Sequence, residues 1–223
     1  MERRHYKIAI LGGTGAQGTG LALRLAVAGH EITIGSRDAE RARAAAADLS
    51  ARTAKPVAGT NNSDAASAAE IVFLTVPYAA QRTTVEAVLD QLRGKILVDA
   101  TVPLVPPKVG VVALPKGQSA VAAIQQLTGK NVRVVSAFQS VSAQRLADLA
   151  HAIDCDVLVC GNDAPACELV IGLCADLGLR GLHAGPIGNS AAAEALTSVL
   201  ITINRRYKVP GGAGIRITGI PES

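Results

Sequence analysis

The stretch of sequence that decides the fold is Ile10-Leu11-Gly12-Gly13-Thr14-Gly15-Ala16-Gln17-Gly18. It contains the spacing G-x-G-x-x-G, formed by Gly13, Gly15 and Gly18. A short apolar run precedes it, and a helical pattern and a second apolar run follow within about 30 residues, which is the context that a dinucleotide-binding βαβ unit requires. In such a unit Gly13 permits a sharp turn, Gly15 lets the backbone approach a pyrophosphate, and Gly18 lets the helix pack closely against the strand.

Short runs rich in Val and Ile alternate with longer Ala-rich stretches along the chain. This alternation is typical of buried parallel strands joined by crossover helices, so we predict an α/β protein with a Rossmann-type, doubly wound parallel sheet. Residues 101–117 contain four prolines and are expected to be irregular. The predicted strands are 7–11, 31–34, 71–76, 96–100 and 132–138, with a weaker one at 56–60, and the predicted helices between them include 40–51 and 79–92.

A second series of elements begins near residue 142 with a short helix. It continues with predicted strands at 157–160 and 179–183, a helix at 164–177 and a long helix at 189–206, capped by Asn189 or Ser190. We expect residues 1–150 to form the dinucleotide-binding domain and residues 151–223 a smaller C-terminal α/β domain. No low-complexity linker separates them, so the second domain is expected to close a shared cleft.

Composition excludes several classes of protein. Of 223 residues, 49% are hydrophobic and 18% are charged, which predicts a globular chain. Only 2% are aromatic, which argues against stacking of single-stranded nucleic acid, and the net charge of +4 favours a small anionic ligand over a polyanion. No apolar run reaches the roughly 18 residues of a membrane span, and no signal peptide is evident, so we expect a cytoplasmic protein without a membrane partner.

The end of the second strand indicates which dinucleotide is bound. NAD-binding units usually place Asp or Glu there, to accept hydrogen bonds from the ribose hydroxyls. This chain instead has Ser36 and Arg37, with Arg41 one helical turn further on. A hydroxyl and two guanidinium groups suit the 2′-phosphate of NADP, because arginine binds phosphate through two parallel charged hydrogen bonds.

No pattern in the sequence predicts a catalytic side chain or a metal site. The cysteines have neither zinc-site nor disulfide-framework spacing, and the histidines lie in unrelated places. Hydride transfer between two bound cofactors requires neither a catalytic side chain nor a metal site. Alignment and exclusion of water suffice, because the reactive atoms belong to the cofactors. The residues concerned are Cys155, Cys160, Cys167, Cys174, His5, His30, His151 and His183.

Further short motifs follow one another along the chain. They are Gly12-Gly13-Thr14-Gly15, Gly29-His30-Glu31-Ile32, Gly35-Ser36-Arg37, Pro103-Leu104-Val105-Pro106, Val134-Val135-Ser136-Ala137, Val159-Cys160-Gly161, Ala184-Gly185-Pro186 with Asn189-Ser190, and Gly214-Ile215-Arg216. With this series the chain resembles the NADPH-dependent reductases of the deazaflavin coenzyme F420, from about Lys7 to Thr218. The resemblance implies hydride transfer between NADP(H) and F420.

The resemblance also implies roles for individual residues. It places Thr14, Gly15, Ala16 and Gln17 at the pyrophosphate and Ser36, Arg37 and Arg41 at the 2′-phosphate, in agreement with the motifs. Around the nicotinamide and deazaflavin it places Val76, Ala80, Val102, Ala143 and Ala213.

Two features of the expected deazaflavin pocket are particular to this chain. Where the family pattern commonly has a histidine, two residues after Ala137, the chain has Gln139, which can still orient the deazaflavin edge but carries no charge. The walls are expected to be mainly Val, Ala, Gly and Pro, with backbone approach at Gly211, Gly212 and Gly214 and with only Tyr78, Phe138 or Tyr207 as a possible ring.

Two alternatives remain open at this point. One is an NADPH-dependent reductase of the same fold that acts on an imine, a ketone or a metal chelate. The other is a non-catalytic sensor of the NADP redox state. The Ala-rich helix at 191–204 has few charges and predicts either core packing or a homodimer interface.

Overall fold

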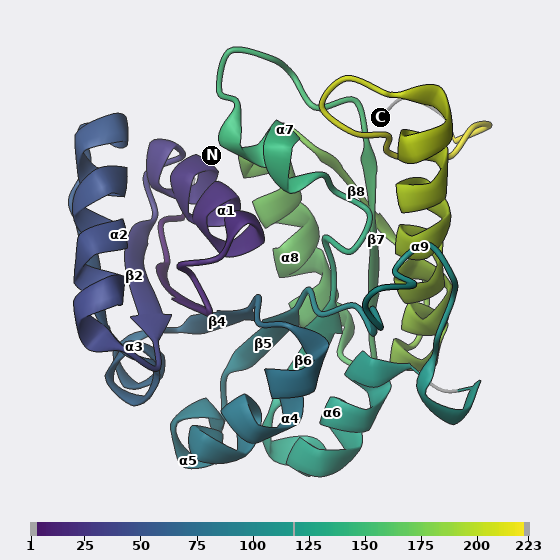
Figure 1. Cartoon of the computed structure of the whole chain (residues 1–223). Coiled ribbons are helices and arrows are strands. Elements are labelled where there is room, and N and C mark those ends of the chain that lie inside the picture. Colours follow the sequence, from purple (N-terminus) through teal and green to yellow (C-terminus); the bar gives the residue numbers. More distant parts are fainter. Residues whose placement is uncertain (1–3, 118, 221–223) are drawn as a thin grey trace.

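The computed structural model describes residues 4–117 and 119–220, and these form an eight-stranded sheet with helices on both faces (Figure 1). The strand order is β3-β2-β1-β4-β5-β6-β7-β8. The first six strands are mutually parallel, and the order reverses between β1 and β4, as in a Rossmann fold. They are β1 (Lys7–Leu11), β2 (Glu31–Ser36), β3 (Val57–Asn61), β4 (Ile71–Leu74), β5 (Ile96–Asp99) and β6 (Arg133–Ser136).

The last two strands make the sheet a mixed one. β7 (Asp156–Gly161) pairs antiparallel with β6, with Ser136 opposite Cys160, and β8 (Arg180–His183) pairs parallel with β7. The α/β, Rossmann-type class predicted from the sequence is confirmed, and the C-terminal strands extend the same sheet in the opposite direction.

Two apolar cores lie on opposite faces of the sheet. β1 serves both, because Ile8 and Ile10 belong to one core whereas Ala9 and Leu11 belong to the other. The first core is covered by α1 (Ala16–Val27), α2 (Ala39–Thr53), α7 (Ala143–Ala147) and α8 (Ala164–Asp176). The second is covered by α3 (Asn62–Ala68), α4 (Tyr78–Ala87), α5 (Leu89–Leu92) and α6 (Ala120–Thr128), and α9 (Ser190–Tyr207) contacts α6 and β7.

All predicted strands are present, whereas the helices differ in detail. The helix predicted at 79–92 is divided into α4 and α5 at Val88, whose backbone leaves the helical region. In the described part of residues 101–117 there is a single 3-10 turn, Pro115–Gly117, and no strand. α3 and α6 were not predicted. None of the described helices has the length and apolarity required to cross a membrane.

α1 is fastened to two other helices through Arg24, near its C-terminal end. The Arg24 guanidinium donates hydrogen bonds to the carbonyl oxygens of Leu146 (Nε, 2.9 Å) and Arg145 (Nη2, 3.0 Å) in α7. It also donates to the carbonyl of Leu177, which caps α8, at 3.4 Å. One half-buried cation thus binds carbonyl groups at the C-terminal ends of two helices, where backbone carbonyls lack helical partners.

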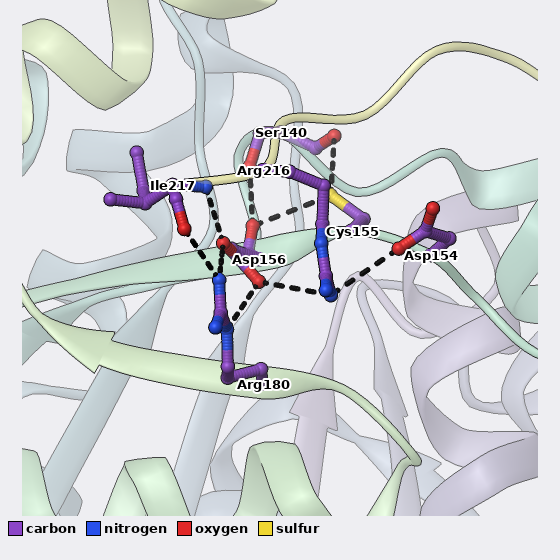
Figure 2. Close-up of polar contacts among 7 residues, drawn as sticks. All are labelled: Ser140, Asp154, Cys155, Asp156, Arg180, Arg216 and Ile217. Carbon is purple, nitrogen blue, oxygen red and sulfur yellow. Dashed lines mark hydrogen bonds and ion pairs between the residues drawn. The ribbon is translucent and has the colours of Figure 1, made fainter. Parts of the chain in front are cut away.

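The C-terminal segment, residues 208–220, is bound to the start of β7 (Figure 2). The side chain of Asp156 is fully buried and accepts hydrogen bonds from Arg180 Nε (2.8 Å) and Nη2 (2.6 Å) and from the backbone N–H of Ile217 (2.6 Å). The Asp156 N–H donates to the carbonyl of Ile215 at 2.7 Å. The hydrogen bond from Arg180 lowers the pKa of Asp156, so the carboxylate is ionised and holds the segment in place.

We predict that Asp156→Ala lowers the free energy of unfolding by roughly 3 kcal/mol, because it leaves a partly buried guanidinium without its carboxylate. The matched control is Asp154→Ala. Asp154 pairs with Arg216 at 3.3 Å, but its side chain is 82% exposed, so the loss should stay below about 1 kcal/mol. Urea denaturation at neutral pH measures the loss of unfolding free energy in both variants. Equal losses would contradict the conclusion that Asp156 holds the C-terminal segment in place. Since the folded-state pKa of Asp156 is lowered, this contribution is present at neutral pH and disappears as acid protonates the carboxylate.

Candidate functional site

A cavity of about 850 Å³ lies at the carboxyl ends of the parallel strands, where the strand order reverses. In open α/β sheets this is the place where ligands bind. Every parallel strand contributes the residues that follow it, and α9 contributes one. The lining residues are Gly12, Thr14, Gly15, Ala16, Gln17, Ser36, Arg37, Asp38, Arg41, Asn62, Thr75, Val76, Pro77, Ala80, Thr84, Ala100, Thr101, Val102, Leu104, Phe138, Gln139, Val141 and Thr197.

Most of the residues singled out from the sequence meet at this cavity. Eleven line it, namely Thr14, Gly15, Ala16, Gln17, Ser36, Arg37, Arg41, Val76, Ala80, Val102 and Gln139. Gly13 and Gly18 are not among the lining residues and pack against the chain beneath the turn.

Two of the expected residues lie elsewhere. Ala143 begins α7, which packs against α1. Ala213 lines a separate cavity of about 140 Å³ that also includes Arg145 and Cys155. Gly212 and Gly214 line that smaller cavity as well, and the side chains that they approach most closely are those of Ser142 and Cys155.

The three glycines of the turn differ in how much space a Cβ would have at each position. A Cβ on Gly13 would lie 2.7 Å from the Ile10 carbonyl oxygen, and one on Gly18 would lie 2.5 Å from Thr75 Oγ1. A Cβ on Gly15 would meet only the Gly12 carbonyl oxygen, at an ordinary 3.5 Å. Gly13 and Gly18 are therefore required by the fold, whereas Gly15 leaves room at the cavity surface.

The N-terminus of α1 is open toward an anion. Its N-cap residue, Gly15, has no side chain to accept from the first backbone N–H groups, and the first turn contains no acidic residue. By contrast, Asp38, Ser119 and Asp163 cap α2, α6 and α8. The free N–H groups and the positive end of the helix dipole thus remain available at the cavity.

Two cations stand beside this helix end. Arg37 and Arg41 line the cavity, and within the described ranges neither guanidinium forms an ion pair. The nearby acidic side chains are occupied, since Glu40 pairs with Arg43, and Asp38 accepts from the N–H groups of Glu40 (2.9 Å) and Arg41 (3.2 Å). This end of the cavity is suited to a phosphate group.

Phe138 shapes the wall opposite the glycine turn. Its backbone has φ of 72°, a left-handed conformation that is unfavourable for an aromatic residue and that clusters at ligand-binding sites in proteins. Its carbonyl accepts from Gln17 Nε2 at 3.2 Å, and its ring packs against Phe73 at 5.8 Å. Of the three aromatic residues considered from the sequence, Tyr78, Phe138 and Tyr207, only Phe138 is among the described residues that line the cavity. The side chain of Tyr207 is 73% exposed.

Asp99 supports the wall from behind. It ends β5, is fully buried, and accepts from Gln81 Nε2 at 2.6 Å and from the N–H of Thr101 at 2.9 Å. Burial raises the pKa of Asp99 to about 6, while these hydrogen bonds oppose the rise. Asp99 does not line the cavity, so its effect there is to position Thr101.

A second buried carboxylate places α9 at the site. Glu194 accepts from Ser119 Oγ at 2.5 Å and from the N–H groups of Ala120 (2.7 Å) and Val121 (3.2 Å), at the start of α6. Burial raises the pKa of Glu194, and these donors lower it. Thr197, three residues further on, donates from Oγ1 to the carbonyl of Gln139 at 2.8 Å.

Several lining residues were missed from the sequence. Thr75 and Thr101 follow β4 and β5 closely, so their place after a buried strand could have indicated them. Asn62 directly follows β3 and carries the same signal, although that strand is the weaker one. Thr84 and Thr197 lie within helices and carry no such signal. No group of three or more potential metal ligands occurs in the described part of the chain.

Comparison with known proteins gives a consistent set of relatives. A family model described as NADP oxidoreductase coenzyme F420-dependent matches residues 7–103. The chain is 42% identical to the F420-dependent NADP reductase of Methanothermobacter thermautotrophicus, over 97% of this chain and 96% of that protein. It is also 42% identical to that of Methanocaldococcus jannaschii, over 96% and 99%. A solved structure of a candidate F420-dependent NADP-reductase from Arthrobacter sp. FB24 superposes with a TM-score of 0.78 at 30% identity, covering 92% of this chain and 96% of that one.

The glycine geometry predicts opposite outcomes for two alanine variants. Gly18→Ala should lower the free energy of unfolding by about 2 kcal/mol, because its Cβ overlaps Thr75 and the turn backbone. Gly15→Ala should change it by less than about 1 kcal/mol, since φ of −84° suits alanine and the space is open. Thermal and urea denaturation of the two proteins measure the difference, and similar destabilisation of both would refute it.

Proposed function

This chain belongs to the family of F420-dependent NADP reductases, and on that premise we propose that its cavity binds NADP(H) beside coenzyme F420 and passes a hydride between them. The observation that carries the proposal is the uncapped N-terminus of α1 beside Arg37 and Arg41, which form no ion pair with any residue that the structure describes. Both lie at one end of a cavity whose other end is mostly apolar. A phosphate-binding end and an apolar end are what a dinucleotide placed against a flat ring requires.

The polar end fits NADP. The N–H groups at the start of α1 would hold the pyrophosphate, with Gly15 giving it room. Ser36, Arg37 and Arg41 would hold the 2′-phosphate. The Ser36 hydroxyl accepts from the Asp38 N–H at 3.2 Å and keeps its own proton to donate.

The other end fits two stacked rings. Val76, Ala80, Val102 and Val141 supply apolar walls, and Gln139 and Thr197 supply the polar groups on the side of α9. When bound, the two cofactors supply the carbon that gives the hydride and the carbon that receives it. The chain's own residues align the rings and exclude water, so the reaction needs no side chain as acid or base.

We also propose that residues 151–223 close the deazaflavin side of the cavity, through Thr197 of α9. The same helix supports a proposed homodimer, because it carries Val199, whose side chain is 43% exposed. Thr202 and Ser198 of α9 donate hydrogen bonds to the carbonyls of Gly110 and Val111, in a loop that has further exposed valines beside Val199 in the proposed interface.

A cytoplasmic location is proposed as well, in keeping with four cysteines that are all free and buried.

The direct test is to mix the purified protein with F420 and saturating NADPH and to follow the visible absorbance of F420. We expect the absorbance to fall, and to return when NADP⁺ is added in excess. If F420 stays oxidised while NADPH binds, the second substrate is another acceptor, and imines, ketones and metal chelates would be assayed next.

Arg37 should distinguish the two dinucleotides. We expect Arg37→Ala to weaken NADPH binding by about 2 kcal/mol, or roughly 30-fold, and to leave NADH binding within about twofold, because only NADPH has the phosphate. Arg43→Ala is the control, since Arg43 lies on α2, the helix that follows Arg37, but pairs with Glu40 and does not line the cavity. Calorimetric titration measures all of these affinities, and equal losses for NADPH and NADH would remove Arg37 from the 2′-phosphate site.

A further inference from the structure

Asp99 is a buried acid that no cation of the described chain neutralises. Its side chain is fully buried, and its carboxylate accepts from two uncharged donors, Gln81 Nε2 at 2.6 Å and the Thr101 N–H at 2.9 Å. Among the residues that the structure describes, no Lys, Arg or His forms an ion pair with it. Buried carboxylates in proteins are normally paired, because an isolated charge is costly to remove from water.

The two hydrogen bonds do not require a charge. An asparagine at position 99 would accept from the Thr101 N–H through its Oδ1, and the Gln81 amide, turned over, would accept from its Nδ2. A neutral residue could therefore hold the same loop and the same helix without the cost of burying an anion. What these contacts leave unexplained is the negative charge itself.

The carboxylate lies directly behind the apolar end of the cavity. Thr101, which donates to it, lines the cavity, and Val102 follows. Gln81, the other donor, directly follows Ala80 of α4, which also lines the cavity. Ala80 and Val102, two of the walls proposed for the rings, are thus the sequence neighbours of the two residues that hold the carboxylate. A single layer of residues separates the charge from the proposed ring site.

Glu194, the other buried carboxylate near the cavity, is placed differently. It accepts from the N–H groups of Ala120 and Val121 at the N-terminus of α6, where the helix dipole compensates a negative charge. The two hydrogen bonds to Asp99 come from a side-chain amide and a loop N–H instead. The field of Asp99 is therefore less compensated, and it reaches further in the protein interior than it would in water.

The two forms of NADP differ by one charge, and that charge is on the ring. The reduced nicotinamide is neutral, and the loss of a hydride to the acceptor leaves it a pyridinium cation. A negative charge behind the ring site lowers the free energy of the cation relative to the neutral ring. Arg37 and Arg41, at the phosphate end, act alike on both forms because the phosphates do not change.

We propose that Asp99 is a specificity-determining residue whose negative charge, acting through the cavity wall, favours binding of NADP⁺ over NADPH. This inference rests on the proposed function and deepens it. Because the oxidised form is stabilised, bound NADPH is a stronger hydride donor than free NADPH. A tenfold change in the ratio of the two affinities corresponds to about 30 mV for a two-electron couple. Asp99 exchanges no proton with either cofactor and touches neither.

The test is equilibrium binding of NADP⁺ and of NADPH, without F420, to the wild-type protein and two variants. The measured quantity is the ratio of Kd for NADPH to Kd for NADP⁺. At pH 8, Asp99→Asn should lower this ratio by about tenfold, because the charge is lost and the hydrogen bonds are kept. Asp90→Asn is the matched control, since Asp90 is 81% exposed on α5 and pairs with Arg93. Its ratio should stay within about twofold of wild type.

A purely structural role for Asp99 predicts a different result. Loss of a residue that only holds the wall would weaken both nucleotides and leave the ratio as it is in wild type. An unchanged ratio in Asp99→Asn would therefore overturn the inference. Failure of both nucleotides to bind the wild-type protein would instead overturn the proposed function, and the inference with it.

The wild-type protein gives a second readout that does not depend on the folding of a variant. Burial raises the pKa of Asp99 to about 6, so the carboxylate loses its charge as the pH falls from about 8 to about 5.5. The ratio should fall by about threefold over this range in wild type and stay constant in Asp99→Asn. Titration of the nucleotide phosphates is common to both forms and cancels. A wild-type ratio that is independent of pH would contradict the inference.

Other ionisable groups are separated from Asp99 by the same comparison. Asp99 faces the side of the sheet covered by α4, α6 and α9, because Leu97, two residues earlier, belongs to that core. Glu194 of α9 is the charge that raises the pKa of Asp99 after burial, and α6 has no ionisable residue. The ionisable residues of α4 are Tyr78 and the exposed pair Arg82 and Glu86. All of them remain in Asp99→Asn, so a pH dependence that they caused would persist there.

Discussion

The structure depends on how closely α1 approaches the ends of β1 and β4. At Gly18 the space left by the absent side chain is bounded by Thr75 Oγ1, the Gly13 Cα and the Gly12 carbonyl, all within 3.0 Å of where a Cβ would be. Thr75 also donates from its hydroxyl to the Leu11 carbonyl at 2.9 Å, which joins the two strand ends beneath the helix. Because no side chain fits there, the helix can direct its free N–H groups across the strand ends, and the cavity lies directly in front of them.

The part of the site built on this contact was predictable from the sequence, because its signals are local. Gly13, Gly15 and Gly18 mark the turn by spacing, and Ser36 and Arg37 are identified by the missing carboxylate at the end of the second strand. All six parallel strands were also predictable. β1, β4 and β5 are short apolar runs that are buried almost throughout, whereas the edge strand β3 is only partly buried and gives a weaker signal.

The remaining part could not be predicted, because it depends on long-range contacts. α3 consists of Asn, Ser, Asp and Ala, so it has no large apolar residues to give a helical period, and it forms through the Asn61 cap and burial of Ala65 and Ala66. The reversal of β7 leaves no mark in its composition. Thr197 reaches the cavity only because Glu194, a residue that reads as a surface charge, is buried against the N-terminus of α6. Ala143 and Ala213 were placed by resemblance, and the segments that carry them are bound to α1 and to β7 rather than to the cavity.

Arg24 attaches the C-terminal end of α1 to α7 and α8. α1 is 12 residues long, or about 18 Å, with the cavity at one end and the carbonyl groups of α7 and α8 at the other. A ligand bound at the N-terminus stabilises the folded state by an amount that grows with the logarithm of its concentration. The opening of α7 and the C-terminal end of α8 requires Arg24 to release them, so occupancy of the cavity should slow amide hydrogen exchange and proteolysis in segments that touch no ligand. The lifetime of this protein in a cell would then follow the supply of its dinucleotide.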